Sequence, residues 1–174
     1  GAWKSVVGTP TVGAAPTGPI CPEPRLRAQR VTVELAGSKV RTWAYGARIG
    51  VPELRLRAGQ RLRAVLENSL PEETTIHWHG IRLANAMDGL PGMTQAPVKP
   101  GGSFTYDFVA PDPGTYFFHP HVGVQLDRGL YGPLVVEDPR EPLVYDEEAV
   151  LVLDDWLDGV AGTPAEALKR LIKV

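Results

Sequence analysis

Short segments with a hydrophobic period of two, each bounded by glycine or proline, are the feature that most limits how this chain can fold. Residues 31–35 alternate apolar and polar side chains, and residues 40–45 are rich in β-branched and aromatic ones. Residues 53–66 alternate leucine with arginine on both sides of Gly59. A period of two is typical of a half-buried strand. The sequence therefore predicts one hairpin over 31–45 and a second over 53–66, bent at Gly59.

Further strands are predicted at similar spacing, and glycine or proline lies in every interval between them. They are residues 75–79, 103–109, 115–119, 131–137 and 149–153. The 174 residues include 19 glycines and 17 prolines, which supply these turns. Many short strands within one domain's length predict an all-β fold, a Greek-key β-sandwich of antiparallel strands. One helix is predicted after Thr163, because a capping box with Glu166 precedes leucines at helical spacing.

Composition divides the chain into three parts. Residues 1–24 are rich in glycine, proline and alanine without a hydrophobic period, which predicts an irregular N-terminal segment. Residues 25–140 contain the predicted sandwich. Residues 141–174 begin as a linker and include the last predicted strand and the helix. So short a segment cannot build a core of its own. It is expected either to pack back on the first domain or to open a second, incomplete one.

Composition and charge exclude several classes of function. The single cysteine, Cys21, rules out a disulfide within the chain, a C-x-x-C redox pair and a zinc site built on several thiolates. The formal net charge is −2 and the basic residues are dispersed among acidic ones, so nucleic acid is not an expected partner. No run approaches the roughly 18 apolar residues of a membrane helix, so no membrane partner is expected. Any metal site must therefore rest on histidine.

All four histidines fall into two H-x-H pairs, His77 with His79 and His119 with His121. Random placement would produce two such pairs in roughly four of ten thousand arrangements, so chance is a poor explanation. Residues i and i+2 of a strand point to the same face, so each pair presents two imidazoles together. Imidazole binds Zn, Cu, Fe and Ni, and the affinity order favours Cu(II). The four histidines are therefore predicted metal ligands.

Residues next to these pairs are predicted to serve the fold. Trp78 points away from its two histidine neighbours and is expected to pack in the core. The aromatic run 116–118 is likewise expected in the core rather than in an electron path. Pro120 has no N–H, which places the second pair on an edge strand or at a strand end. The arginines of 53–66 are expected to form a solvated face rather than a binding strip.

The motifs around the histidines resemble the first cupredoxin domain of multicopper oxidases such as laccases. They are H-W-H-G at 77–80, M-D-G at 87–89, the segment 94–106, G-T-Y-F-F-H-P-H at 114–121 and G-L-Y-G-P-L at 129–134. The resemblance is dense over residues 30–140, and D-D-W at 154–156 is similar to the opening of that family's second domain. It implies a cupredoxin-like sandwich over 25–140 and the incomplete start of a second cupredoxin domain within 141–174.

The resemblance also implies a role for each histidine. In that family the first domain supplies half the ligands of a three-copper cluster that reduces dioxygen to water. Carried onto this chain, His77 would bind the type 2 copper, His79 and His119 one type 3 copper, and His121 the other. Asp88 would match the acidic residue that helps to deliver protons. From the residues alone, an ordinary Asp-Gly turn is the favoured interpretation of Asp88, and only the resemblance points to proton delivery.

The chain departs from the family pattern in lacking an H-x-x-H-x-H motif and an H-C-H motif. Cys21 has no histidine nearby and cannot be the thiolate of the type 1 copper. That copper, which takes electrons from a phenol-like or metal-ion substrate, is expected on further cupredoxin domains, in cis or on another chain. The chain alone is expected to be inactive. An extracytoplasmic location, periplasmic or secreted, is implied by the resemblance and by a first residue that suggests a processed start.

Two other functions remain open from the sequence. Two H-x-H pairs provide enough imidazoles for a self-contained mononuclear Zn or Cu site, hydrolytic with Asp88 as the base. The chain could also be a non-enzymatic copper-binding module that stores or passes on the metal. Metal stoichiometry separates both from a shared cluster.

Overall fold

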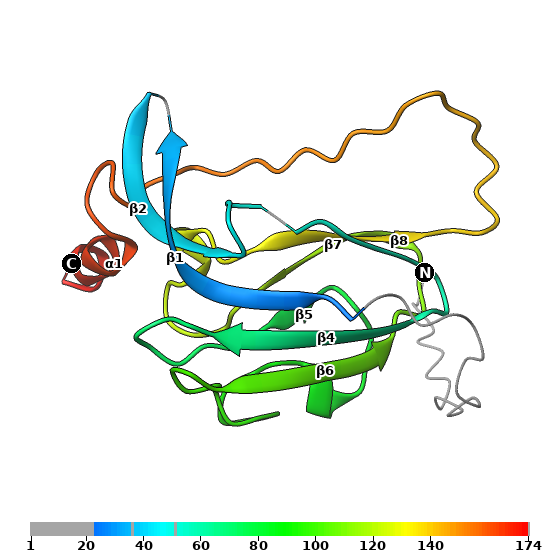
Figure 1. The fold of residues 1–174 in the computed structure, drawn as a ribbon, viewed down its shortest axis with the longest axis horizontal. Coiled ribbons are helices and arrows are strands. Elements are labelled where there is room, and N and C mark those ends of the chain that lie inside the picture. Colours follow the sequence, from blue (N-terminus) through cyan, green and yellow to red (C-terminus); the bar gives the residue numbers. More distant parts are fainter. Residues whose placement is uncertain (1–22, 36, 51, 174) are drawn as a thin grey trace, which may run out of the picture.

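Two four-stranded sheets pack face to face in the computed structural model, which describes residues 23–35, 37–50 and 52–173 (Figure 1). The first sheet has the order β2-β1-β4-β6 and comprises β1 (Arg25–Leu35), β2 (Ser38–Tyr45), β4 (Arg61–Asn68) and β6 (Ser103–Val109). The second has the order β3-β8-β7-β5 and comprises β3 (Leu54–Arg57), β5 (His77–His79), β7 (Gly114–His119) and β8 (Gly132–Glu137). Two 3-10 turns, η1 (Asn85–Met87) and η2 (Leu126–Arg128), and one helix, α1 (Pro164–Ile172), complete the described elements. The predicted two-layered sandwich is confirmed.

The hairpin predicted over 31–45 is present as β1 and β2. They pair antiparallel from Ala28 opposite Tyr45 to Leu35 opposite Ser38. β1 begins at Arg25, before the predicted start, because its first residues pair in parallel with β4 as well. The predicted irregular segment 1–24 and Cys21 lie almost wholly outside the described residues, and only residues 23 and 24 are seen, without regular structure.

The hairpin predicted over 53–66 is wrong. β3 and β4 belong to different sheets: β3 pairs with β8 in parallel, and β4 pairs with β1 and β6. At the bend, Gly59 donates its N–H to the carbonyl of Ala110 rather than closing a hairpin ladder. Leu54, Leu56 and Leu62 are nonetheless all buried, because the two strands face one core from opposite sides. Both sheets are therefore mixed rather than purely antiparallel.

The core lies between the sheets and is rich in large side chains. Leu26, Leu66 and Tyr106 enter it from the first sheet, and Trp78 and Phe118 enter it from the second, all fully buried. The expectation that Trp78 packs in the core is confirmed. This packing is the main source of stability, since each fully buried large apolar side chain contributes about 1.5–3 kcal/mol. It also fixes which face of β5 and β7 remains outside.

The segment after β8 differs from the prediction. Residues 149–153 form no strand, and Leu151 and Leu153 are 83% and 93% exposed. A strand needs a hydrogen-bonded partner, and none of the described strands pairs with this segment. In Figure 1 it is the orange path that arches away from β8 and returns toward α1. α1 begins as predicted, with Thr163 and Glu166 forming a capping box.

The end of this path is anchored to the sandwich by buried polar contacts. Asp158 is 1% exposed, and one carboxylate oxygen accepts a hydrogen bond from the Thr42 hydroxyl at 2.7 Å. The same oxygen lies 3.3 Å from the Arg128 guanidinium. Four residues earlier, Asp154 accepts a hydrogen bond from the Tyr131 hydroxyl at 2.7 Å. Residues 154–158 therefore pack back on the first domain, whereas 141–153 stay mostly exposed.

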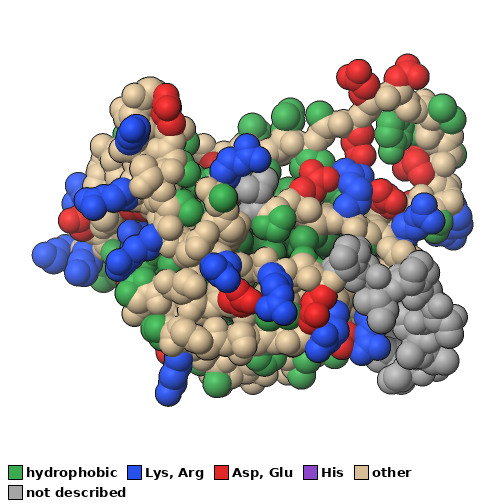
Figure 2. Space-filling view, in the orientation of Figure 1, with side chains coloured by type: hydrophobic (Ala, Val, Ile, Leu, Met, Phe, Trp, Pro, Cys, Tyr) green, Lys and Arg blue, Asp and Glu red, His purple; other side chains and the backbone are tan. Residues whose placement is uncertain are grey.

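The arginines of β3 and β4 are solvated, as predicted, but they lie on the outer faces of two different sheets rather than on one hairpin face. Arg61 pairs with Asp107 on the neighbouring strand at 2.6 Å, and Arg55 pairs with Glu53, Glu137 and Glu148. Figure 2 shows basic side chains beside acidic ones on the face of the molecule that it draws. Exposed pairs of this kind contribute about 0–1 kcal/mol each. No helix among the described residues has the length and apolar character needed to cross a membrane.

Candidate metal centre

The two H-x-H pairs meet on neighbouring strands of the second sheet. β5 and β7 pair antiparallel, with His77 opposite His119 and His79 opposite Phe117. Between them Trp78 lies opposite Phe118, and both are buried in the core. Because side chains alternate along a strand, burying these two rings turns the histidines to the outer face. The prediction that each pair presents its imidazoles on one face agrees with this pairing, which brings the two pairs together.

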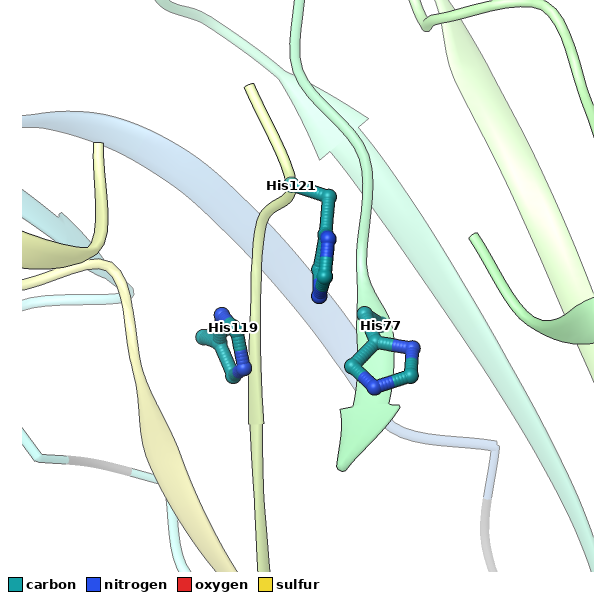
Figure 3. Close-up of side chains that lie close together, drawn as sticks. All are labelled: His77, His119 and His121. Carbon is teal, nitrogen blue, oxygen red and sulfur yellow. The ribbon is translucent and has the colours of Figure 1, made fainter. Parts of the chain in front are cut away.

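Three of the imidazoles point to one place (Figure 3). His77, His119 and His121 each offer a ring nitrogen, and these atoms lie within 4.8 Å of one another. The ring centroids of His77 and His121 are 4.4 Å apart, and those of His77 and His119 are 5.5 Å apart. β7 ends at His119, so His121 lies just past the strand, as Pro120 predicted. These three nitrogens could bind a metal ion together.

His79 joins the group through His119. Its Nδ1 lies 3.1 Å from Nε2 of His119. Two imidazole nitrogens that each bind one ion at about 2.0 Å, at a near-tetrahedral angle, are separated by about 3.3 Å. His79 and His119 are thus already at the separation that a shared ion requires. His119 therefore belongs both to this pair and to the group of three converging histidines.

Hydrogen bonds to backbone carbonyls indicate which ring nitrogen of His77 and of His119 remains available for metal. Nδ1 of His119 lies 3.1 Å from the Pro120 carbonyl, and Nδ1 of His77 lies 2.9 Å from the Asp88 carbonyl. A carbonyl oxygen only accepts, so each Nδ1 carries the hydrogen and each Nε2 keeps a lone pair. Metal-binding histidines usually donate their second nitrogen in this way, which fixes the ring and raises its basicity.

The electrostatics favour neutral imidazoles. Burial, together with the nearby His121, His77 and His79, lowers the pKa of His119 to about 4. Burial and the neighbouring His77 also lower the pKa of His121. Metal binding requires the unprotonated ring. At neutral pH these two histidines therefore need not release a proton before an ion binds.

Asp88 is brought against His77 by the glycine that follows it. Asp88 caps η1, and its Oδ1 lies 3.3 Å from Nδ1 of His77. Gly89 has a φ of +77°, and a Cβ there would lie 1.7 Å from the carbonyl oxygen of Ile76. Only glycine allows the loop to approach β5 so closely. The structure thus places Asp88 beside the histidines; its role in proton delivery stays a prediction.

Phe117 is a site residue that the sequence interpretation missed. Its ring stacks on His79 at 4.5 Å and on His119 at 4.8 Å between centroids. The expectation of a core position is therefore wrong for Phe117, although it is confirmed for Phe118. The available signal was the period of two, which places Phe117 on the same face as His119. Cys21, the only cysteine of the sequence, lies outside the described residues.

Comparisons with known proteins agree with this geometry. A sequence profile of the family described as "Multicopper oxidase" matches residues 27–141. "Multicopper oxidase MmcO" of Mycobacterium tuberculosis is 45% identical over 162 residues, which is 93% of this chain and 31% of that protein. "Copper resistance protein A homolog" of Pseudomonas syringae pv. tomato is 36% identical over 174 residues, 99% of this chain and 29% of that protein.

Solved structures show the same fold. The crystal structure of a multi-copper oxidase from Pseudomonas parafulva matches with a TM-score of 0.74 and 47% identity, covering 82% of this chain and 36% of that one. The multi-copper oxidase from Pseudomonas thermotolerans matches with a TM-score of 0.65 and 48% identity, covering 69% of this chain and 30% of that one. The cupredoxin-like fold is confirmed. This chain spans less than a third of the length of the two curated relatives named above.

Replacing Gly89 by alanine is expected to destabilise the protein more than the same change at Gly92. Both have left-handed φ angles, +77° and +74°, but nothing lies within 4 Å of a Cβ at Gly92. Gly92→Ala should cost about 1–2 kcal/mol, the strain of the backbone alone. Gly89→Ala should cost a further 1–3 kcal/mol or so, because the loop must move away from Ile76. Urea unfolding measures both, and equal losses would contradict the close approach.

Acid is expected to destabilise the metal-free protein through His119. Its pKa is about 4 when folded and about 6.5 when unfolded, so between these values the unfolded chain binds more protons. The unfolding free energy should therefore fall by roughly 2–3 kcal/mol as pH drops from 6.5 to 4. Urea unfolding at several pH values measures this slope. His119→Gln, which cannot titrate, should flatten the slope, and an unchanged slope would rule out His119 as its source.

Proposed function

The chain belongs to the multicopper oxidase family, and on this premise we propose that it supplies half of the histidine ligands of a type 2/type 3 trinuclear copper cluster. When bound, the coppers would pass electrons from a reducing substrate to dioxygen, which is reduced to water. Imidazole suits this task because it stays neutral and holds its geometry while the metal changes oxidation state. The residues of this chain hold the metals, orient the rings and supply a proton.

The observation that carries the proposal is the open outer face of β5 and β7. It gathers four imidazoles, three with nitrogens within 4.8 Å of one another and the fourth 3.1 Å from His119. His79 and His121 are exposed, and His119 is buried. A structural metal site that served this chain alone would be expected to complete the coordination of its metal with buried ligands. Exposed ligands instead leave room for a second set of histidines.

The geometry supports the individual assignments. His79 and His119, at 3.1 Å, would share one type 3 copper. His121 would bind the other type 3 copper, and His77 would bind the type 2 copper through Nε2, since its Nδ1 faces Asp88. Phe117 would hold two of these rings in place by stacking against them.

Asp88 would deliver protons to the reduced oxygen. Its side chain is 31% exposed and its Oδ1 lies 3.3 Å from the His77 ring, so it touches both the solvent and the site. A carboxylate in this place can take a proton from water at Oδ1 and release it toward the cluster. Four protons are consumed for each dioxygen, so this relay would work repeatedly in each cycle.

We propose that further cupredoxin domains, in cis or on another chain, complete the protein. They would carry the type 1 copper and the site for the reducing substrate, a phenol or a low-valent metal ion. Residues 149–153 would form the opening strand of a second domain, which would explain why Leu151 and Leu153 lie exposed without a described partner strand. An extracytoplasmic location fits a family whose relatives include proteins named for copper resistance.

A second candidate function rests on the three histidines that already converge. His77, His119 and His121 could hold one Zn or Cu ion without any partner. Asp88 would then act as a general base on a metal-bound water, in a hydrolytic site, or the ion would simply be stored. This candidate requires one tightly bound ion per chain.

Metal stoichiometry and oxygen uptake separate the two candidates. The 174-residue chain alone is expected to bind Cu(II) weakly, at less than one ion per chain, and to consume no oxygen with a phenol. The complete assembly should bind the full set of coppers and consume oxygen, and His79→Ala should abolish that uptake. Copper analysis and an oxygen electrode provide the measurements.

Two results would overturn the shared-cluster proposal. One is a single ion held tightly by three or four histidines of the isolated chain. The other is a His79→Ala assembly that retains turnover with its coppers bound. The coding sequence after Val174 gives an independent check, because the proposal expects H-x-x-H-x-H and H-C-H motifs there or on a partner chain.

Asp88→Asn is expected to slow oxygen reduction by about a hundredfold in the complete assembly, because an amide cannot hold and release the proton. Copper content should stay unchanged, since Asp88 is not proposed as a ligand. Asp112→Asn is the matched control, an aspartate paired with Arg82 on the surface. Turnover measured against pH decides the matter, and an Asp88→Asn variant as fast as the control would exclude the relay.

A further inference from the structure

His121 lies where the sheet no longer holds it. β7 ends at His119, so no strand ladder fixes the backbone two residues later. His121 has a long hydrogen bond, from its N–H to the Thr75 hydroxyl at 3.4 Å, and its ring stacks on that of His119 with 5.1 Å between centroids. Its ring also lies 4.4 Å from that of His77. None of these contacts fixes the backbone that follows His121, so the contacts of the next residues bear on its position.

Gln125 is a buried side chain in the loop that follows His121. It follows His121 by four residues and is 3% exposed. Its Nε2 donates to the Glu73 carbonyl at 2.9 Å, and its Oε1 accepts from the Thr74 hydroxyl at 2.7 Å. One amide thus ties the loop after His121 to the residues just before β5. We call these two hydrogen bonds the Gln125 bridge.

The segment on the other side of the Gln125 bridge is rigidly held. The Tyr45 hydroxyl donates to the Thr75 carbonyl at 3.1 Å, and the Ile76 N–H donates to the Tyr106 hydroxyl at 2.7 Å. All four of these residues are fully buried. Residues 75–76 run directly into His77, so His77 has a fixed place relative to the core. The Gln125 bridge therefore connects the His121 turn to the same buried segment that positions His77.

We propose that Gln125 is a positioning residue that sets His121 against His77 in the metal centre. This inference rests on the proposed function, because it gives the bridge a purpose in metal binding. Gln125 touches no ring of the cluster and acts only through the backbone of its loop. A ligand on an exposed turn needs such support, since binding sites tolerate errors of only about 0.5 Å.

Loss of the bridge has a definite consequence. Without Gln125, the Thr74 hydroxyl and the Glu73 carbonyl lose a buried partner, and the loop must move to let water reach them. The movement carries His121 away from His77. Three converging imidazoles would then become two, held by the pairing of β5 with β7.

The first test needs no metal. In the metal-free chain, NMR should detect a nuclear Overhauser contact between the rings of His77 and His121, and Gln125→Ala should abolish it. Asn68→Ala is the matched control, because Asn68 is 2% exposed and its amide donates to the carbonyls of Glu72 and Val98 at 2.8 Å. It removes a buried amide bridge of the same kind without touching the His121 turn.

The second test uses Cu(II) alone as the probe. Gln125→Ala should weaken Cu(II) binding by about tenfold, whereas Asn68→Ala should leave it unchanged. Thr74→Val, an isosteric change that removes one half of the bridge, should show a smaller loss in the same direction. This milder variant decides the question if Gln125→Ala does not fold.

The inference is overturned if the His77–His121 contact survives in both bridge variants, or if Asn68→Ala abolishes it equally. Because that contact is measured without metal, the result tests the role of Gln125 independently of the proposed copper cluster. A chain that holds one ion tightly by itself but loses the contact in Gln125→Ala would refute the proposed function and leave the positioning role intact.

Discussion

The pairing of β5 with β7 is the constraint on which the site depends. One register places Trp78 opposite Phe118 in the core and, as a consequence, His77 opposite His119 on the outer face. A slip of one residue would turn the histidines inward and the tryptophan outward, because the side-chain period of a strand is two. Burial of two aromatic rings therefore sets the direction of two candidate metal ligands. The hydrophobic core and the candidate metal centre lie on opposite faces of the same three-residue strand.

Loops, rather than strands, bring Asp88 and His121 to His77. Asp88 reaches His77 because Gly89 lets its loop touch the backbone of Ile76, and His121 reaches His77 because Gln125 ties its turn to residues 73–74. Both contacts hold a loop against the segment just before β5. The buried hydroxyls of Tyr45 and Tyr106 fix that segment to the core. The site is thus built outward from one rigid edge strand.

Two parts of the described surface expose side chains that a neighbouring domain could cover. The outer face of β5 and β7 presents histidines to solvent, and residues 149–153 present apolar side chains without a partner strand. Buried Asp158 and hydrogen-bonded Asp154 hold the far end of that segment against the first domain. Both surfaces are ones that the proposed further cupredoxin domains would cover.

Local patterns were enough to predict the strands of the sandwich, the capped helix and the two same-face histidine pairs, because alternation and capping involve residues close in sequence. They were wrong at 149–153, which forms no strand. The same alternation was misleading at 53–66, since it reports which side chains are buried and not which strand lies alongside. The contact of Asp88 with His77, the stacking of Phe117 and the Gln125 bridge were decided by tertiary structure alone. Each joins segments that are distant in the sequence or depends on a register, and no short-range pattern encodes the distance between them. The sequence by itself determined the kind of ligand and its face; the fold decided which ligands meet.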